Sequence, residues 1–415
     1  MNKSLRILVL SDIHAYTKAD HDGIRPSYVF AGDNQRTAPT KSLLDKSDDV
    51  CGNVDLIVCA GDLGDKAEPS ALNFAWQFLL HLARKLGDPP LVVATGNHDV
   101  DSRLQISDFD PKGNLFSLDP TYPVVYPSSY PDQDELQENI KLNYWARNFA
   151  IFHLERARIV VLNSAAYHGY GAKNREFDHG RISSRTLEDL KRQLQQDQEK
   201  HGKPFINIIV FHHHLESDSE VDHPDAIDAS KMLGAPHLVH LLSDPSFGRW
   251  FVIHGHRHHP RIYRIGDAGA PIILSAASFG STNEKDYWNN SPNQIHLVDL
   301  DFCLMKDLQL YPAGSIRSHS YAPGIGWAPD LRTGGLPPII GFGFTGSIEQ
   351  LAKTVDGHCK TSVIQWEDLV DKVQLLRACT HDHLFQLRKV LEQEYGLKLV
   401  FDNTHNPIQV GKNVK

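Results

Sequence analysis

Five short apolar runs in this chain each end in a cluster of aspartate, asparagine or histidine, and this feature constrains the fold more than any other. The runs with their polar clusters are 5–10 with Asp12 and His14, 54–60 with Asp62, 91–95 with Asn97, His98 and Asp99, 205–211 with His212, His213 and His214, and 250–254 with His256 and His258. Continuous apolar runs of this length are typical of strands buried on both faces in an α/β core. Ligands of open α/β sheets gather at the carboxyl ends of strands, so we expect one site to collect all five clusters.

Other segments predict the elements around these strands. Residues 157–163 and 271–274 are further apolar runs, and residues 70–86 and 184–201 have helical patterns, the second that of an amphipathic surface helix. The alternating segments 294–301 and 305–311 predict antiparallel edge strands. Alternating strands and helices with a late β-only stretch predict an α/β fold, a two-sheet sandwich flanked by helices.

The domain organisation is expected to have three parts. Residues 1–313 form the main domain, and residues 314–346, rich in Gly and Pro, form a linker or wrapping segment. Residues 347–415 form a small, mainly helical region, with helices at 347–356 and 365–395 and a short strand or tail at 397–401. Residues 16–46 and 101–139 follow directly after two of the polar clusters, and we expect these long segments to be loops that act as lids.

Composition excludes several classes of function. Lys and Arg number 42 against 51 Asp and Glu, a net charge of −9, which argues against a non-specific grip on DNA or on anionic lipid. The five cysteines form no CxxC pair, which fits a reducing compartment. The first residues lack a long apolar stretch before a cleavage site, and no apolar run approaches the roughly 18–20 residues that span a bilayer. We therefore expect a soluble, cytoplasmic protein with no membrane partner.

The types of side chain in the clusters predict a metal site. Imidazoles mixed with carboxylates and one amide oxygen suit Mn²⁺, Fe or Zn²⁺ better than Mg²⁺ or Ca²⁺. Three acidic or amide groups and four histidines are too many for one tetrahedral ion. They suit two ions roughly 3.5–4 Å apart that share a bridging carboxylate. We expect two divalent ions, with Mn²⁺ as the first choice and Fe or Zn²⁺ as alternatives.

The order of the motifs resembles a known superfamily. D-x-H, G-D, G-N-H-D, a histidine after a strand and G-H-x-H occur in this order in the calcineurin-like metallophosphoesterases, and the closest motif set is that of the class III cyclic-nucleotide phosphodiesterases. The resemblance covers roughly residues 5–312 and implies a four-layered α/β/β/α sandwich. It also implies a hydrolase in which a hydroxide between two metal ions is the nucleophile.

The resemblance assigns roles to residues at matching positions. The implied ligands of the first metal are Asp12, His14, Asp62 and His258, and those of the second are Asp62, Asn97, His212 and His256. His98 would act on the leaving group as general acid or transition-state stabiliser, with Asp99 available to orient it. His212 is the expected ligand of its triplet because it comes first after the strand. His213 and His214 remain alternatives, or groups that face substrate, solvent or a lid.

The substrate is left between alternatives. Protein serine/threonine phosphatases carry an arginine that this chain lacks in residues 61–66, and purple acid phosphatases carry a tyrosine where Asp65 stands. The first expectation is a phosphodiester substrate, nucleotide-like or a cyclic nucleotide. The second is a DNA or RNA nuclease working with a partner such as an ATPase. A third is a signalling or phage-defence effector whose C-terminal helices recruit a protein partner. Tyr122, Tyr126 and Tyr130 would either stack on a nucleobase or anchor their loop.

Overall fold

The computed structural model describes most of the chain. The described residues are 4–19, 23–102, 110–119, 122–127, 133–154, 156–170, 179–216, 231–266, 269–282, 291–308, 311–329, 334–359, 363–402 and 406–412. Within them the chain forms two compact units. One comprises Met1–Leu5, Val298–Ser318 and Leu336–Lys415, and the other comprises Arg6–Leu297 and His319–Gly335.

The first sheet carries the amino-terminal strands. Its neighbouring strands follow the order β13-β12-β11-β1-β2-β3-β4, and β14 also pairs with β12. These strands are β1 (Ser4–Leu10), β2 (Leu56–Cys59), β3 (Leu91–Val93), β4 (Val124–Val125), β11 (Gln294–Asp301), β12 (Gly314–Ala322), β13 (Gly326–Ala328) and β14 (Ile339–Phe342). Strands β1, β2 and β3 are parallel, with Leu10 opposite Cys59 and Cys59 opposite Val93. Their carboxyl ends therefore lie together at one edge.

The second sheet has the order β5-β6-β7-β8-β10-β9. Its strands are β5 (Phe149–Leu154), β6 (Ala157–Leu162), β7 (Ile206–Val210), β8 (Trp250–His254), β9 (Arg261–Arg264) and β10 (Ile272–Ser275). Strands β6, β7, β8 and β10 are parallel, so β7 and β8 also end at one edge. All residues of β6, β7 and β8 are buried, which explains their continuous apolar sequences.

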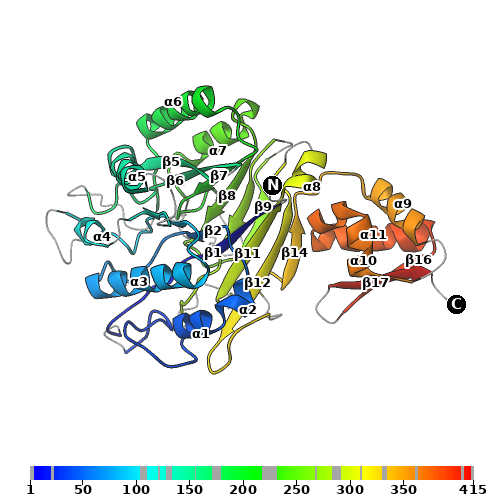
Figure 1. Cartoon of the computed structure of the whole chain (residues 1–415), viewed down its shortest axis with the longest axis horizontal. Helices are drawn as coiled ribbons and strands as arrows, with labels where there is room; N and C mark the ends of the chain where they lie inside the picture. The colour runs from blue at the N-terminus through cyan, green and yellow to red at the C-terminus, as the bar shows by residue number, and fades with distance from the viewer. Residues whose placement is uncertain are drawn as a thin grey trace, which may run out of the picture. The chain divides into compact units, whose positions relative to one another are not determined.

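Helices cover the outer faces of the sandwich. The helices of the larger unit are α1 (Pro39–Asp45), α2 (Ser47–Cys51), α3 (Pro69–Lys85), α4 (Gly113–Phe116), α5 (Gln133–Arg147), α6 (Ser184–His201), α7 (Ala235–Ser243) and the 3₁₀ turn η1 (Pro245–Phe247). Figure 1 shows α6 and α7 side by side over the second sheet. Leu190 and Leu194 of α6 and Leu238 of α7 join one apolar cluster with residues of β7 and β8, such as Ile209 and Val252. This packing confirms the predicted α/β sandwich.

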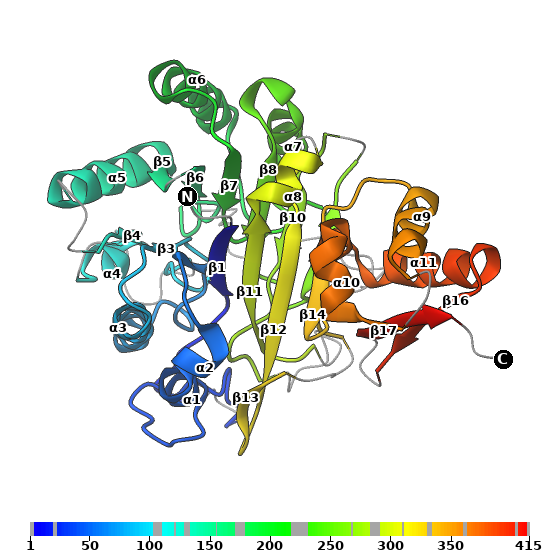
Figure 2. The ribbon, with the colours of Figure 1, turned by 45° about the vertical axis from the view of Figure 1, so that its right-hand side comes forward.

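The carboxyl-terminal region combines helices with a small sheet. Its elements are β15 (Ile364–Gln365), β16 (Leu397–Phe401), β17 (Pro407–Lys412), α9 (Ile348–His358), α10 (Trp366–Lys372), η3 (Gln374–Ala378) and α11 (His381–Glu394). The strand order is β15-β17-β16, and Figure 2 shows β16 and β17 beside α10 and α11. In the described part of the chain, no helix is both long and apolar enough to span a bilayer.

The predicted strands and helices are largely confirmed, but several segments differ. All seven apolar runs form strands, whereas β5 (FAIFHL) was not predicted although it is mostly apolar. Residues 294–301 form β11 between β12 and β1, so the prediction of an edge strand was wrong. Residues 314–346, expected as a linker or wrapping segment, contain β12, β13 and β14. The expected loops contain helices, of which α5 is the longest, and the helix expected at 365–395 is divided into α10, η3 and α11.

The strand expected at residues 305–311 is also wrong, because a helix begins three residues earlier. Helix α8 (Phe302–Asp307) is capped by Asp301, whose carboxylate accepts hydrogen bonds from the backbone N–H groups of Cys303 at 2.9 Å and Leu304 at 3.1 Å. An aspartate in this position satisfies the backbone donors that a helix start leaves unpaired. The capped start of α8 therefore outweighs the alternation of apolar and polar residues that predicted a strand at 305–311.

We expect Asp301→Ala to destabilise the first turn of α8 by about 1 kcal/mol, whereas Asp301→Asn keeps an oxygen acceptor and stays close to the unmodified chain. Hydrogen–deuterium exchange of a peptide containing residues 302–308 should then be about fivefold faster in the alanine variant. Equal exchange in the two variants would show that the side-chain cap does not hold this helix.

Candidate metal centre

The five polar clusters follow strands whose carboxyl ends lie at one edge of each sheet. Asp12 and His14 follow β1, Asp62 follows β2 and Asn97 follows β3, while His212 and His256 follow β7 and β8. The turns after β1 and β2 are joined by backbone hydrogen bonds, since the N–H of Asp12 donates to the carbonyl of Gly61 at 2.9 Å. The N–H of His14 donates to the carbonyl of Asp62 at 3.0 Å.

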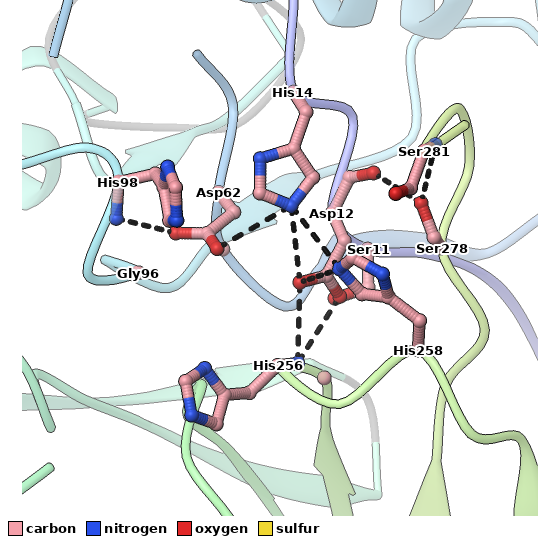
Figure 3. Close-up of polar contacts among 12 residues, drawn as sticks. Ser11, Asp12, His14, Asp62, Gly96, His98, His256, His258, Ser278 and Ser281 are labelled. Carbon is pink, nitrogen blue, oxygen red and sulfur yellow. Dashed lines mark hydrogen bonds and ion pairs between the residues drawn. The ribbon is translucent and has the colours of Figure 1, made fainter. Parts of the chain in front are cut away.

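A first group of side chains contains Asp12, His14, Asp62 and His258. Nε2 of His258 lies 3.3 Å from Oδ1 of Asp12, and Nε2 of His14 lies 3.6 Å from Oδ2 of Asp62. The Nε2 atoms of His14 and His258 are 3.1 Å apart. Figure 3 shows the His14 ring directed between the carboxylates of Asp12 and Asp62. We call these four residues the first cluster.

A second group contains Asp62, Asn97, His212 and His256, which we call the second cluster. Oδ1 of Asn97 lies 3.1 Å from Nε2 of His212 and 3.1 Å from Nδ1 of His256. Nε2 of His212 also lies 3.2 Å from Oδ2 of Asp62. This is the same carboxylate oxygen that faces His14, so Asp62 belongs to both clusters. The structure thus brings together all seven residues expected as ligands.

The donor atoms of the two clusters fit divalent cations. Imidazole nitrogens, carboxylate oxygens and an amide oxygen converge in a buried space where Asp12 and Asp62 are almost fully buried. Burial raises the pKa of Asp62, but His212 and His98 outweigh that effect, so the pKa lies well below its usual value. Burial lowers the pKa of His14 to about 4, which favours the neutral imidazole that binds metals. Burial lowers the pKa of His212, but the Asp62 carboxylate outweighs that effect and raises it to about 9, so the buried carboxylates attract positive charge at this place.

The backbone at the ligand positions is unusual. Five of the seven residues have φ angles in the left-handed region, and these are Asp12 at 52°, His14 at 49°, Asp62 at 56°, His256 at 84° and His258 at 55°. Such conformations cost of order 1–3 kcal/mol for each residue with a side chain and are concentrated at functional sites. The left-handed residues turn the chain sharply after β1, β2 and β8, and these turns direct the side chains toward the shared centre.

The glycines of the motifs are required by close approach to the same side chains. A Cβ atom on Gly61 would lie 2.7 Å from Nδ1 of His212. A Cβ atom on Gly96 would overlap the carboxylate of Asp62, and one on Gly255 would overlap Ser11 and crowd Asp12. The glycine in G-D, in G-N-H-D and in G-H-x-H therefore provides the space in which the ligands meet.

Comparison with known proteins decides the family. A family model of the calcineurin-like phosphoesterases matches residues 5–267, which is more than half of the chain. The chain belongs to the calcineurin-like phosphoesterase family. The family relationship confirms the hydrolase class and the use of two divalent metals, for which the two clusters provide the candidate sites.

Solved structures resemble the chain more distantly. A dimetal phosphatase from Danio rerio is 13% identical over 79% of this chain and 98% of its own, with a TM-score of 0.42. A purple acid phosphatase from yellow lupin (Lupinus luteus) seeds is 13% identical over 82% of this chain and 54% of its own, with a TM-score of 0.41. The comparison with curated proteins gives no match.

The partner of His98 differs from the expectation for this phosphoesterase. Nδ1 of His98 lies 3.0 Å from Oδ1 of Asp65, and the backbone N–H of His98 donates to Oδ1 of Asp62 at 2.8 Å. Asp65 was not predicted as a site residue, although its position three residues after Asp62 could have indicated that it lies near the site. Burial raises the pKa of Asp65, but its hydrogen bond with His98 outweighs that effect and lowers the pKa below its usual value.

Asp99 has a different task from the orienting role expected for it. Its carboxylate accepts hydrogen bonds from the backbone N–H groups of Leu63 at 2.6 Å, Gly96 at 2.8 Å and Asp62 at 2.9 Å. Burial and the neighbouring Asp62 carboxylate raise the pKa of Asp99 to about 7. Asp99 thus fixes the two turns that carry Asp62 and Asn97, because its oxygens are already used by the backbone.

The three histidines that follow β7 make different contacts. Nδ1 of His212 lies 2.7 Å from the carbonyl oxygen of Ala60, so Nε2 faces the second cluster. The ring of His214 packs against His254 at a centroid distance of 4.5 Å. Both His213 and His214 are fully buried, so neither faces solvent.

Two of the three tyrosines expected either to stack on a nucleobase or to anchor their loop can be placed in the structure. Tyr122 and Tyr126 are buried, and Tyr122 shares a hydrogen bond of 2.9 Å with Thr95, so these two residues anchor their segment. Tyr130 lies outside the described residues. Exposed aromatic rings occur instead at Tyr28 and Phe30, which are 40% and 43% exposed.

We expect Asp62→Asn to weaken binding at both metal positions, since its carboxylate faces both clusters. Metal content after equilibrium dialysis against Mn²⁺ would fall from two ions per chain toward none. Asp65→Asn is the matched control, because Asp65 contacts His98 and lies outside both clusters. Loss of a single ion in Asp62→Asn would contradict the shared position of this carboxylate.

Proposed function

We propose that this chain is a phosphodiesterase that hydrolyses a small, nucleotide-like diester, such as a cyclic nucleotide, with two divalent ions of which Mn²⁺ is the first choice. The observation that carries the proposal is the position of Asp62 between two histidine-rich clusters, with His98 beside it. Two bound divalent ions would supply Lewis-acid activation of the phosphoester and of the attacking water.

The residues of the chain have separable tasks in this reaction. The first and second clusters would hold the ions, and Asp99 keeps the turns of Asp62 and Asn97 in place. The His98 side chain is 29% exposed, whereas Asp12, Asp62 and His212 are almost fully buried, so a substrate can reach His98. Asp65 holds the ring through Nδ1, and Nε2 would carry the proton that the leaving oxygen needs.

Aromatic rings near His14 support a nucleotide-like substrate. Tyr16 follows His14 by two residues, and its ring contacts Phe30 at a centroid distance of 5.4 Å. The backbone joins the two segments, since the N–H of Tyr16 donates to the carbonyl of Val29 at 3.1 Å. Tyr28 and Phe30 are both partly exposed. Stacking of a base on an aromatic ring is worth about 1–3 kcal/mol, so this surface suits a nucleobase.

A nuclease is the second candidate, and a pocket lined by residues before β5, after β6 and in α6 favours it. The cavity of about 920 Å³ is lined by Arg147, Arg185 and Arg192 together with Tyr167 and Asp189. Arg147 and Arg192 both pair with Asp189, so the positive charge of the pocket is partly neutralised. These arginines would bind the phosphate groups of a nucleic-acid strand. An ATPase partner for such a nuclease stays a prediction.

The third alternative concerns the C-terminal region. The buried leucines of α11, Leu384, Leu387 and Leu391, give this region an apolar interior of its own. Recruitment of a protein partner through these helices, in a signalling or phage-defence role, stays a prediction, as does the cytoplasmic location.

A substrate panel tests the proposed function. The metal-free chain is reconstituted with Mn²⁺ and assayed on bis-p-nitrophenyl phosphate, p-nitrophenyl phosphate, 2′,3′- and 3′,5′-cyclic nucleotides, and labelled single- and double-stranded DNA. We expect metal-dependent cleavage of the diesters and cyclic nucleotides, with DNA intact. Degradation of DNA would favour the nuclease, and hydrolysis of the monoester alone would rule out a phosphodiesterase.

We expect His98→Ala to reduce turnover of diesters with poor leaving groups by about 10²–10⁴-fold, because the leaving oxygen loses its proton donor. Asp65→Asn should cause a smaller loss in the same direction, since the ring loses its anionic partner. Both variants should bind two ions, as neither residue belongs to the clusters. An equal loss for activated and unactivated esters, or a loss of metal, would contradict the role of His98.

A further inference from the structure

His213 occupies a position that packing alone does not explain. It directly follows His212 and is fully buried. Its Nδ1 lies 2.8 Å from Oγ of Ser164, while its Nε2 is buried with no hydrogen-bond partner among the described residues. Native proteins seldom leave a buried polar nitrogen without a partner, so this atom calls for an explanation from its surroundings.

The ring of His213 lies against the second cluster. One nitrogen from each of His212, His213 and His256 lies within 4.8 Å of the other two. The ring centroid of His213 is 4.9 Å from that of His212 and 4.7 Å from that of His256. Since His212 and His256 both reach Oδ1 of Asn97 at 3.1 Å, His213 adjoins the place where an ion would bind.

The surrounding residues fix the orientation of His213. A Cβ atom on Gly180 would lie 2.5 Å from Cγ and Nδ1 of the ring, so only glycine leaves room for it. Oγ of Ser164 also accepts a hydrogen bond from the backbone N–H of His212 at 3.2 Å. One hydroxyl group therefore holds both histidines at the end of β7.

We propose that Nε2 of His213 is an additional protein ligand at the second cluster. This inference rests on the proposed function, because it assumes that an ion binds there. Histidines that bind metals usually hydrogen-bond through their other ring nitrogen to an oxygen. His212 shows this pattern with the carbonyl of Ala60, and His213 shows it with Ser164. His213 thus repeats the arrangement of its neighbour.

His214 shows that a buried, unpartnered nitrogen is not sufficient. Both of its ring nitrogens are buried without a partner, yet it belongs to no group of potential metal ligands among the described residues. Its nearest ring neighbour is His254 rather than the second cluster. His213 differs because two other candidate ligands lie within reach of it.

A third imidazole would change the metal preference of this position. The second cluster would then offer three imidazoles, one carboxylate and one amide, whereas the first offers two imidazoles and two carboxylates. Imidazole ligands favour Zn²⁺ and Co²⁺ relative to Mn²⁺. We therefore expect the second cluster to bind these ions more tightly than the first.

The test uses the full chain, stripped of metal and titrated with Co²⁺ while its visible absorption is followed. The unmodified chain should bind two ions in two steps of different affinity. His213→Phe keeps a ring without nitrogen, and it should weaken the tighter step about 10–100-fold and change its absorption band. Ser164→Ala should shift the same step in the same direction by less.

A control variant and the unmodified chain distinguish a metal-binding role of His213 from a general effect of removing a buried histidine. His214→Phe removes a buried histidine next to His213 and should leave both steps and the spectrum unchanged. Binding and absorption of His213→Phe identical to those of the unmodified chain would overturn the inference while leaving the two-metal site intact. Absence of Co²⁺ binding by the unmodified chain would instead overturn the proposed function. If circular dichroism shows that His213→Phe is unfolded, the Co²⁺ titration is repeated with Ser164→Ala and Gly180→Ala. An unchanged tighter binding step and absorption band in both variants would overturn the inference.

Discussion

The carboxylate of Asp62 is the interaction on which the site depends. Its Oδ2 lies within 3.6 Å of His14 and 3.2 Å of His212, and these histidines come from opposite sheets. Its Oδ1 accepts the backbone N–H of His98, so the turn after β3 is fixed to the same group. A single ionised side chain thus joins the first cluster, the second cluster and the turn that carries His98. A buried charge of this kind is costly unless other groups or ions compensate it.

Much of the surrounding structure serves to hold that arrangement. Five residues of the two clusters adopt left-handed backbone, and three glycines are required by the close approach of the cluster side chains or of Ser11. Such local costs are tolerated where the remaining fold is well packed. Here the parallel strands and the helices α6 and α7 bury a continuous apolar cluster, which gives the turns a rigid base. The stability of the sandwich therefore permits strain at the edge where the chemistry takes place.

Histidine is used in several distinct ways around the centre. His14, His258, His212 and His256 face the carboxylates and Asn97, and His98 lies at the accessible side with Asp65. His213 and His214 have the same burial but different neighbours, which is the basis for assigning a metal-binding role to one and not to the other. The carbonyl of Ala60 accepts a hydrogen bond from Nδ1 of His212, and Oγ of Ser164 lies within hydrogen-bond distance of Nδ1 of His213, so Nε2 is the available nitrogen of each ring.

The sequence by itself predicted the strands and the meeting of their polar clusters at one centre, because short continuous apolar runs are typical of buried strands and parallel strands end at a common edge. The resemblance to the phosphoesterases supplied the seven expected ligands. It could not identify Asp65 as the partner of His98, or the backbone contacts of Asp99, since these depend on how the turns after β2 and β3 pack. The cap by Asp301 determines where helix α8 begins. The pairing of β11 with β12 and β1, which are far from each other in the chain, determines its central place in the sheet. The separation of His213 from His214 required the tertiary structure, because adjacent residues in a sequence carry no information about which neighbouring strand each ring will face.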